Sequence, residues 1–454
     1  MNNKPTLVFQ APVATRSGYG ERSRDLLRAL IELDKYDIKV ISTRWGATPL
    51  NALNANDPYD QEIIKRLHFG QLQQQPDIFM QVTIPNEFMP LGKYNIGVTA
   101  GIETDRCSAE WIEGCNKMNL VLVSSEHSAN VLKSTGYQMM NQQHQQVGNL
   151  VFNKNLEVLF EGIDTNIFKK LNTSAEFTSA LVKESFDAIK EDFCFLFVGH
   201  WLPGDFGHDR KNVSAMIRTF FEAFKNKKNG PALVLKSTGG APSIMDRNEL
   251  IKKVNVIKKS VEDANTLPNV YFIYGDLTAS EMNEVYNHPK VKAHLTFTRG
   301  EGYGRPILEA TISGKPLLAP LWSGQKDFLK ADAVIELKGQ LEPIHKSAQW
   351  DKILVKDSKW FTVDYGYAIA AMRDVFKDYK KYVEKCRSHS HYSKTTFSFD
   401  KMKERIDQLL TKYIPEFPKQ VSLQLPKLKK VSDATPNTEP PKITLPKLKK
   451  IETV

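Results

Sequence analysis

The segment from Arg299 to Ala310 places two glutamates, Glu301 and Glu309, around a glycine-rich loop, with seven residues between them. Gly302 and Gly304 let the backbone approach a ligand closely, and the proline that follows suits the first turn of a helix. The unpaired N–H groups and the dipole of that helix start form an anion site. Glu309 would lie about one turn into the helix and face the same crevice as Glu301. Phosphates held by backbone and hydroxyls held by carboxylates suit a nucleotide-sugar, which this segment therefore predicts as a ligand.

This segment, with the strand-like run Gly314–Ala319 after it, resembles the signature of retaining glycosyltransferases of the GT-B fold, family four. The resemblance implies that Glu301 sits against the donor sugar and that Glu309 binds the ribose of the nucleotide. It also implies donor contacts from Gly302, Tyr303, Gly304 and Arg305. The alternative is an ordinary strand–loop–helix unit with two solvated glutamates.

The elements that must position this loop form two successive sets of strands and helices. The strands of the first set are predicted at Thr6–Phe9, Ile38–Ser42, Ile78–Val82, Asn95–Thr99, Leu120–Ser124 and Glu157–Glu161. Those of the second set are predicted at Phe195–Val198, Leu233–Lys236, Val270–Tyr274, Ala293–Phe297, Pro316–Ala319 and Val334–Leu337. Amphipathic stretches lie between several of them, at Glu21–Leu33, Ser128–Ser134, Val213–Phe224, Glu249–Glu262 and Ser280–Tyr286. Such alternation predicts parallel α/β sheets that are covered on both faces.

The predicted fold class is therefore α/β, with two Rossmann-like domains facing an interdomain cleft, and the resemblance implies that it is of the GT-B type. Ligands of open α/β sheets bind beyond the carboxyl ends of the strands, so we expect the site in that cleft. We expect an acceptor-side domain at residues 1–168, an interdomain connection at 169–190 and a nucleotide-sugar domain at 191–395. A helix at 396–417 is expected to cross back to the first domain, and a disordered tail is expected at 418–454. Helical stretches are expected at Val375–Lys385 and Lys401–Tyr413. Their crossing back to the first domain rests on the resemblance alone.

Two further loops contain candidate residues of the first domain. Gly18 and Gly20 follow the first predicted strand and open the first predicted helix, where glycines allow close approach of an anion or a sugar. The resemblance places this loop near the donor phosphates and the acceptor. Glu103 follows another predicted strand and is a candidate catalytic carboxylate, with a helix-capping or surface role as the alternative.

The cations for the donor diphosphate are expected just after the first strand of the second domain. The family pattern has an arginine and a lysine there, whereas this chain has His200 near the arginine position and then an insertion, Leu202–Asp209. Lys211 is the best candidate because two phosphates need positive charge in a partly buried cleft, and Arg210 is the second. The departure from the pattern leaves the arginine contact open, and Arg305 is a further candidate for it.

Composition limits the alternatives. With 454 residues, the chain is long enough for two domains plus appendages. No clusters with metal-ligand spacing are present in the sequence, so we expect neither a metal nor another cofactor. No apolar stretch approaches the ~20 residues that a membrane span needs. The N-terminus passes directly into a strand-like run without a signal-peptide pattern, and the four cysteines are scattered, so a cytoplasmic protein is expected.

Half of the net charge of +10 lies in the last 37 residues, which hold eight lysines and three acidic residues. The hexapeptide Leu-Pro-Lys-Leu-Lys-Lys occurs there twice, at 425–430 and 445–450. Pro- and Lys-rich sequence of this kind does not form a core and is expected to be disordered. It is either a protein-docking motif, a basic arm for nucleic acid or anionic lipid, or a solubilising tail.

The function expected from the residues and the resemblance together is sugar transfer from a nucleoside-diphosphate-sugar to an acceptor hydroxyl, with retention of configuration. The assigned catalytic residues are Glu301, Lys211 and Glu103. The acceptor stays open among polysaccharide, lipid, protein and modified DNA. Two rival functions are a catalytically inactive GT-B protein that binds glycans or nucleotides, and a GT-B epimerase that acts on nucleotide-sugars.

Overall fold

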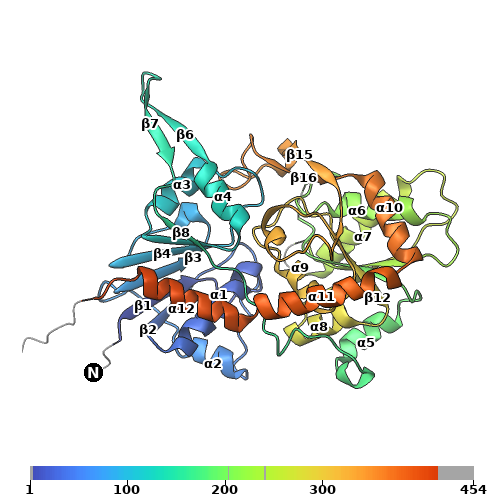
Figure 1. Cartoon of the computed structure of the whole chain (residues 1–454), viewed down its shortest axis with the longest axis horizontal. Helices are drawn as coiled ribbons and strands as arrows, with labels where there is room; N and C mark the ends of the chain where they lie inside the picture. Colours follow the sequence, from blue (N-terminus) through green and yellow to red (C-terminus); the bar gives the residue numbers. More distant parts are fainter. Residues whose placement is uncertain (1–3, 203, 240–241, 418–454) are drawn as a thin grey trace, which may run out of the picture. The chain divides into compact units, whose positions relative to one another are not determined.

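The computed structural model describes residues 4–202, 204–239 and 242–417, and the repeated basic motif of the tail lies outside these residues. Two six-stranded sheets, each covered by helices, make up the described part (Figure 1). Both sheets are entirely parallel, which confirms the predicted α/β class with two Rossmann-like units. We call the first sheet with its helices the first lobe, and the second sheet with its helices the second lobe.

The first sheet has the strand order β2-β1-β3-β4-β5-β8. Its strands are β1 (Thr6–Ala11), β2 (Asp37–Ser42), β3 (Ile78–Val82), β4 (Tyr94–Thr99), β5 (Leu120–Val123) and β8 (Asn155–Val158). Every residue of β3, β4 and β5 is buried, as expected for central strands of a parallel sheet with both faces covered. The last strand begins and ends earlier than the predicted Glu157–Glu161, so Glu161 lies beyond its carboxyl end.

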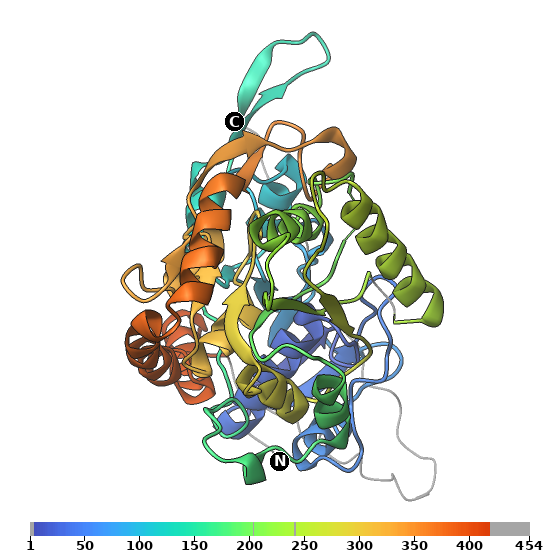
Figure 2. The ribbon, with the colours of Figure 1, turned by 90° about the vertical axis from the view of Figure 1, so that its right-hand side faces the viewer.

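The second sheet has the strand order β11-β10-β9-β12-β13-β14. In Figure 2 the second lobe faces the viewer. Its strands are β9 (Cys194–Val198), β10 (Ala232–Lys236), β11 (Val270–Ile273), β12 (Val291–Leu295), β13 (Leu317–Ala319) and β14 (Ile335–Glu336). All six coincide with predicted strands to within two residues at each end. Runs of Phe, Leu and Val in β9 and β10 are buried at the centre of this lobe.

The helices of the described residues begin mostly at Ser, Thr or Asp caps, which satisfy free N–H groups at the first turn. They are α1 (Gly18–Leu33), α2 (Pro58–Ile64), α3 (Ala109–Asn116), α4 (Glu126–Ser134), α5 (Ala180–Asp187), α6 (Val213–Phe224), α7 (Ile244–Lys259), α8 (Ala279–Asn287), α9 (Arg305–Ile312), α10 (Tyr365–Lys377), α11 (Lys380–Thr396) and α12 (Phe399–Tyr413). Ser17, for example, accepts a hydrogen bond from the N–H of Gly20 at the start of α1.

The last two helices contact different lobes: α11 packs on α9, and α12 packs on α1 (Figure 1). The predicted single helix Val375–Lys385 is wrong, because α10 ends at Lys377 and α11 begins at Lys380. Segment 169–190, predicted as the connection, contains α5 and donates backbone hydrogen bonds to side chains of α8.

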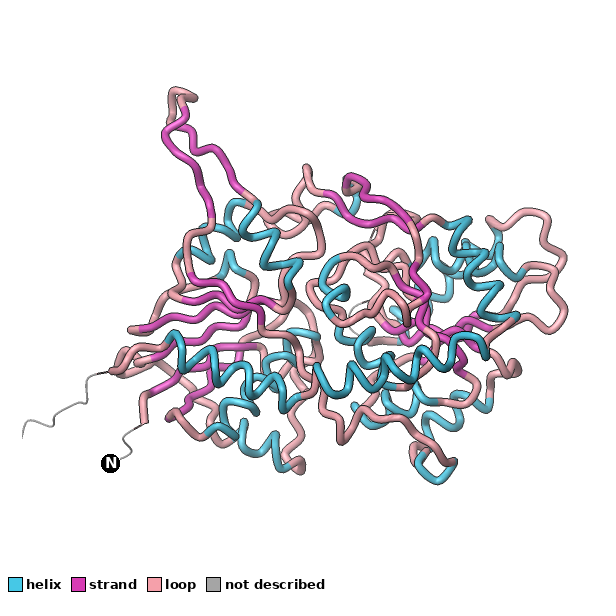
Figure 3. The backbone as a smooth tube through the Cα atoms, in the orientation of Figure 1, coloured by secondary structure: helices cyan, strands magenta, loops and turns pink. Residues whose placement is uncertain are grey.

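Two antiparallel hairpins, which the sequence analysis did not predict, stand outside the large sheets (Figure 3). One pairs β6 (Gly136–Met140) with β7 (Gln146–Val151), and the other pairs β15 (Gly339–Pro343) with β16 (Lys359–Val363). The predicted site residues, by contrast, follow strands of the two parallel sheets. They lie beyond the carboxyl ends of β1, β4, β9 and β12, which is where parallel α/β sheets bind ligands.

Candidate active site

Glu301 lies in the loop between β12 and α9, where its side chain is only 8% exposed. Its carboxylate accepts an ion-paired hydrogen bond from Lys211 and one from the Thr298 hydroxyl at 2.7 Å. The Arg210 guanidinium lies 3.3 Å from its second oxygen. Burial raises the pKa of Glu301, but the two cations outweigh burial, and the pKa is lowered. Glu301 is therefore a carboxylate at neutral pH.

Arg210 and Lys211 come from the loop that follows β9 and precedes α6. Besides its contact with Glu301, Arg210 donates to the carbonyl oxygen of Gly300 at 3.1 Å and lies 3.6 Å from Glu103. Burial lowers the pKa of Lys211, and the contact with Glu301 opposes that effect. For Glu103, burial raises the pKa, and the nearby charge of Arg210 acts in the opposite direction. The structure thus brings together all three predicted catalytic residues, with Arg210 between the two acids.

Glu103 belongs to the first lobe, because it follows the carboxyl end of β4, whereas the other three groups belong to the second lobe. This charged cluster, made of Glu103, Arg210, Lys211 and Glu301, therefore lies between the two lobes. Sequence reasoning did not identify Thr298, which binds the Glu301 carboxylate. It gave no individual role to Ser323, whose hydroxyl accepts from the Glu301 N–H at 2.9 Å. Small hydroxyl residues in loops carry no spacing signal that would have revealed them.

Glu309 lies one turn into α9 and is 8% exposed. Arg305 donates to one of its oxygens at 3.0 Å, and the Tyr286 hydroxyl donates to the other at 3.0 Å. Burial raises the pKa of Glu309 to about 7, although Arg305 acts in the opposite direction. The carboxyl group therefore titrates near neutral pH.

Arg305 contacts three carboxylates. It forms an ion pair with Asp25 of α1, lies 3.7 Å from Glu21 of the same helix, and binds Glu309. The pKa of Arg305 is raised well above its ordinary value, because these acids outweigh burial. Arg305 alone faces three acids, whereas Lys211 and Arg210 together face two, so Lys211 and Arg210 are the better candidates for the diphosphate.

Glycines of the loop before α9 are required where the two lobes touch. A Cβ on Gly300 would overlap the carbonyl oxygen of Glu103, and one on Gly302 would overlap that of Ala100. The Ser125 hydroxyl of the first lobe donates to the carbonyl oxygen of Gly302 at 2.6 Å. In this structure, the close approach that the glycines permit is therefore to backbone of the first lobe.

Gly304 and Tyr303, in the same loop, have roles other than contact with the first lobe. Gly304 precedes α9 with φ +98°, a left-handed conformation that favours glycine. The Tyr303 ring is buried and packs against Phe328 at 5.2 Å between ring centroids, and its hydroxyl has no hydrogen-bond partner. Tyr303 is thus a packing residue in this structure, apart from the charged cluster.

The glycine loop of the first lobe forms the start of α1. Gly20 is enclosed, because a Cβ there would overlap the carbonyl oxygen of Thr15, whereas a Cβ on Gly18 would meet open space. Between them, the Tyr19 hydroxyl bonds with that of Thr99 at 2.9 Å and accepts from the N–H of Ala100. The loop is thereby fixed to the end of β4, which leads to Glu103.

His200 does not replace the missing arginine as a cation. Its Nδ1 lies 2.9 Å from the Thr238 hydroxyl, and burial lowers the pKa of His200 below 6.5, with Lys211 and Arg210 adding to the effect. Lys236 donates to the carbonyl oxygen of Gly275 at 2.6 Å. Neither side chain contacts Glu301.

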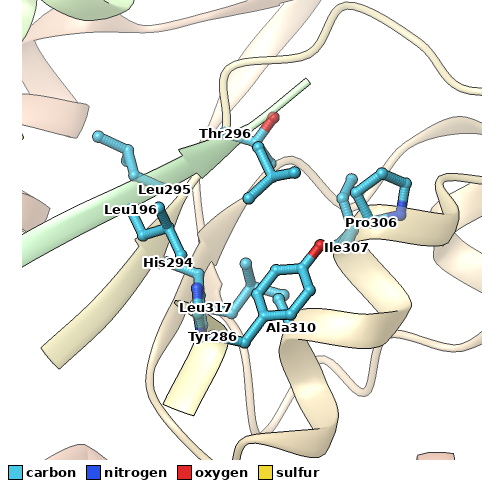
Figure 4. A pocket seen from close by; sticks show the side chains of 10 residues that line it. Leu196, Tyr286, His294, Leu295, Thr296, Pro306, Ile307, Ala310 and Leu317 are labelled. Carbon is cyan, nitrogen blue, oxygen red and sulfur yellow. The ribbon is translucent and has the colours of Figure 1, made fainter. Parts of the chain in front are cut away.

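A small cavity of about 20 Å³ lies beside α9. Figure 4 shows the side chains that line it. Tyr286, His294, Thr296, Pro306 and Ile307 are among its lining residues. This volume holds about one water molecule and is too small for a nucleotide.

Within residues 4–202, 204–239 and 242–417, no group of three or more His, Cys, Asp or Glu is arranged to hold a metal ion. No helix in the same residues is long and apolar enough to cross a membrane.

No protein-family model and no curated protein sequence matches this chain. Solved structures resemble it over most of its length. Sucrose-phosphate synthase from Thermosynechococcus elongatus is 12% identical, with a TM-score of 0.57 over 90% of this chain and 99% of that chain. A glycosyltransferase from Rickettsia africae ESF-5 is 12% identical, with a TM-score of 0.56 over 91% and 100%. Alr3699/HepE from Anabaena, in complex with UDP-glucose, is 12% identical, with a TM-score of 0.54 over 90% and 100%. The chain has the GT-B fold.

Proposed function

We propose that this protein is a retaining glycosyltransferase that moves a sugar from a nucleoside-diphosphate-sugar to an acceptor hydroxyl. The observation that carries the proposal is the charged cluster of Glu103, Arg210, Lys211 and Glu301. In a GT-B fold, this cluster lies beyond the carboxyl ends of strands from both sheets. The proposal is further supported by the structural similarity to Alr3699/HepE, whose structure contains UDP-glucose.

In the proposed reaction, the bond between the anomeric carbon and the donor phosphate breaks, and the nucleoside diphosphate leaves with both electrons. Lys211 and Arg210 would stabilise the negative charge that develops on the leaving group. The acceptor hydroxyl attacks the oxocarbenium-like sugar on the face that the diphosphate has left, so the configuration is retained. Its proton passes to the departing phosphate.

The two glutamates of the α9 loop would orient the donor. Glu301 would bind hydroxyls of the sugar, and Glu309 would bind the ribose. Both carboxylates are nearly buried and paired with protein cations, so a donor would have to replace part of these contacts. We therefore propose that Gly302, Gly304 and the first turn of α9 receive the diphosphate when the first lobe moves off this loop. Gly18 and Gly20 would face it from the first lobe.

We also propose that the reaction needs no metal ion, because Lys211, Arg210 and the α9 N-terminus can supply positive charge to the diphosphate. Activity unchanged by EDTA, and not raised by Mg²⁺ or Mn²⁺, is the expected result. The four cysteines are all buried and unpaired, which supports a reducing compartment such as the cytoplasm.

The proposal is tested first by binding and then by turnover. Thermal shifts with a panel of uridine and guanosine diphosphate-sugars should identify the donor, because a ligand that binds only the folded state raises its stability. Transfer from that donor to polysaccharide, lipid, protein and modified DNA acceptors then identifies the product. Conversion of the donor into another nucleotide-sugar without acceptor would instead indicate an epimerase. Binding without any turnover would indicate a non-catalytic binding protein.

Glu301→Gln is the decisive variant, because glutamine keeps the size of the side chain but removes its charge. We expect transfer to fall by at least about a hundredfold, in the range that one electrostatic contact contributes to an active site. Glu404→Gln, which alters an exposed ion pair of α12, is the matched control. Full transfer activity in folded Glu301→Gln protein would refute the role of Glu301.

A further inference from the structure

The β15–β16 hairpin follows the last strand of the second sheet, but it also contacts the first lobe (Figure 1). Ile353, in the segment that connects the two strands, packs against the buried side chains of the hairpin and against the first-lobe core around α3 and α4. The Ser108 hydroxyl, which caps α3, donates to the carbonyl oxygen of Lys352 at 3.0 Å. The hairpin therefore joins the second lobe to the first beside the loop that carries Glu103.

Asp105 binds the backbone of this hairpin at two points. Its N–H donates to the carbonyl oxygen of Lys359, the first residue of β16, at 3.0 Å. Its carboxylate accepts from the N–H of Lys359 at 2.6 Å. Neither bond uses the charge of the lysine side chain, so both depend on where the strand lies.

Thr104 fixes the segment between Asp105 and Glu103. Its side chain is fully buried, and its carbonyl oxygen lies 3.0 Å from Nε2 of His127 in α4. Little freedom is left in the backbone that separates the two acids. The place of Asp105 therefore determines that of Glu103, whose carboxylate lies 3.6 Å from the Arg210 guanidinium.

The same strand also holds the loop of Glu301. Arg299, two residues before Glu301, accepts at its carbonyl oxygen from the N–H of Phe361 at 2.9 Å. The N–H of Arg299 donates to the carbonyl oxygen of Arg210, also at 2.9 Å. Lys359 and Phe361 are two residues apart, so their N–H groups lie on one edge of β16 and roughly 7 Å from each other. Both acidic loops are therefore attached to one edge of a single strand.

We propose that β16 sets the separation of the two acidic loops, and that Asp105 is the positioning residue through which it holds Glu103 against Arg210. This inference rests on the proposed function. In that reaction, Arg210 stabilises the leaving diphosphate, and its guanidinium keeps its direction while Glu103 and Glu301 hold it from two sides. A displacement of about 1 Å in such a group costs on the order of a hundredfold in rate. Because Asp105 and Lys359 belong to different lobes, their contact assembles this arrangement when the lobes close.

The first test compares Asp105→Ala with Asp105→Asn in the full-length protein, with the donor and acceptor that give turnover in the screen above. Alanine removes the bond to the Lys359 N–H, whereas asparagine keeps an oxygen that accepts it. We expect Asp105→Ala to lower kcat at least about tenfold. The donor KM should stay within about twofold of the wild type, because the donor contacts of Glu301 and Glu309 remain. Asp105→Asn should retain kcat within about twofold.

Asp57→Ala is the matched control. The Asp57 carboxylate also accepts from backbone N–H groups, those of Tyr59 and Asp60, but all three residues lie at the start of α2 in the first lobe. Its replacement removes a helix cap and leaves the contact between the lobes in place, so kcat should be unchanged. Equal losses of kcat in Asp57→Ala and Asp105→Ala would overturn the positioning role.

A double-mutant cycle shows whether Asp105 acts through Glu103. In a Glu103→Gln protein, Asp105→Ala should lower kcat less than about twofold, because the group that it positions is already altered. A residue with only a structural role would cause the same loss in both backgrounds, and that result would overturn the proposal. Full activity of the Glu103→Gln protein would overturn it too.

Hydrogen exchange of the substrate-free protein tests the contact without any turnover. Asp105→Ala should speed exchange at least about tenfold in peptides that cover residues 100–106 and 358–363, because both segments lose a contact that keeps them closed. Asp105→Asn and Asp57→Ala should exchange these peptides as the wild type does. Unchanged exchange in Asp105→Ala would overturn the proposal. If the protein transfers no sugar, the proposed function fails, and the exchange rates alone decide whether β16 holds the two loops.

Discussion

Arg305 of α9 and Asp25 of α1 form an ion pair that joins the second lobe to the first. Both side chains are nearly buried, and the same guanidinium also binds Glu309, the proposed ribose ligand. Arg305 therefore links the contact between the lobes to the donor site. Any ligand that binds Glu309 will change the balance of charge around Arg305.

Asp25→Asn should lower the free energy of unfolding by about 1–3 kcal/mol, which is less than the usual cost of breaking a buried ion pair. The cost is reduced because Arg305 retains Glu309 and Glu21 as partners. Urea unfolding of the variant and the wild type measures the difference. Asp407→Asn is the control: it breaks an exposed pair between α12 and Lys35, which follows the end of α1, and should change stability by less than about 1 kcal/mol.

Glu309 should make the stability depend on pH. Its pKa is raised in the folded protein to about 7 from an ordinary value of 4.5, so the folded state binds more protons between these values. Stability is therefore lost as the pH rises from about 4.5 through 7, by on the order of 3 kcal/mol. Glu309→Gln removes this contribution, because the amide does not titrate.

The measurement for Glu309 compares wild type with Glu309→Gln by urea unfolding at pH 5 and at pH 8. The free energy of unfolding of the variant minus that of the wild type should be larger at pH 8 than at pH 5. For Glu404→Gln, the difference in unfolding free energy from the wild type should be the same at both pH values, because Glu404 is exposed. A difference between wild type and Glu309→Gln that is the same at both pH values would contradict the raised pKa.

The two sheets and much of the candidate site could be predicted from the sequence. Strands such as β3 and β10 are runs of Ile, Phe, Val or Leu, and burial on both faces makes those runs conspicuous. Glu103, Lys211 and Glu301 could be placed together because each follows a strand of a parallel sheet. The carboxyl ends of parallel strands lie at the same edge of a sheet, so their proximity could be predicted before the packing of the side chains was known.

Other features depend on packing that sequence patterns do not encode. Asp25 reads as a surface acid of an amphipathic helix, and its pairing with Arg305 follows only from the way the lobes meet. Tyr286 reads as a core aromatic residue, although its hydroxyl binds Glu309. The β6–β7 hairpin was missed because its strands have no regular apolar alternation and its Gln-rich tip, residues 141–145, contains no glycine.

Lys211 and Glu301 should be strongly coupled in stability. Lys211→Met alone, or Glu301→Leu alone, leaves one buried charge without its main partner and should cost about 3–5 kcal/mol. The double variant removes both charges, so its cost should be smaller than the sum of the two single changes by at least about 1 kcal/mol. Unfolding free energies of the four proteins give the coupling. Additive costs would show that the pair is not formed in solution.

The glycines of the α9 loop should be more sensitive to substitution than those of the α1 loop. Gly302→Ala places a Cβ against the carbonyl oxygen of Ala100, so the loop and the first lobe must separate locally. Overpacking of this kind typically costs 1–3 kcal/mol. Gly18→Ala is the matched control, because its Cβ meets open space at the start of a helix, where alanine should be neutral or stabilising by up to about 1 kcal/mol. Thermal unfolding distinguishes the two. Equal melting temperatures for both variants would mean that, in solution, the loop does not rest on the first lobe.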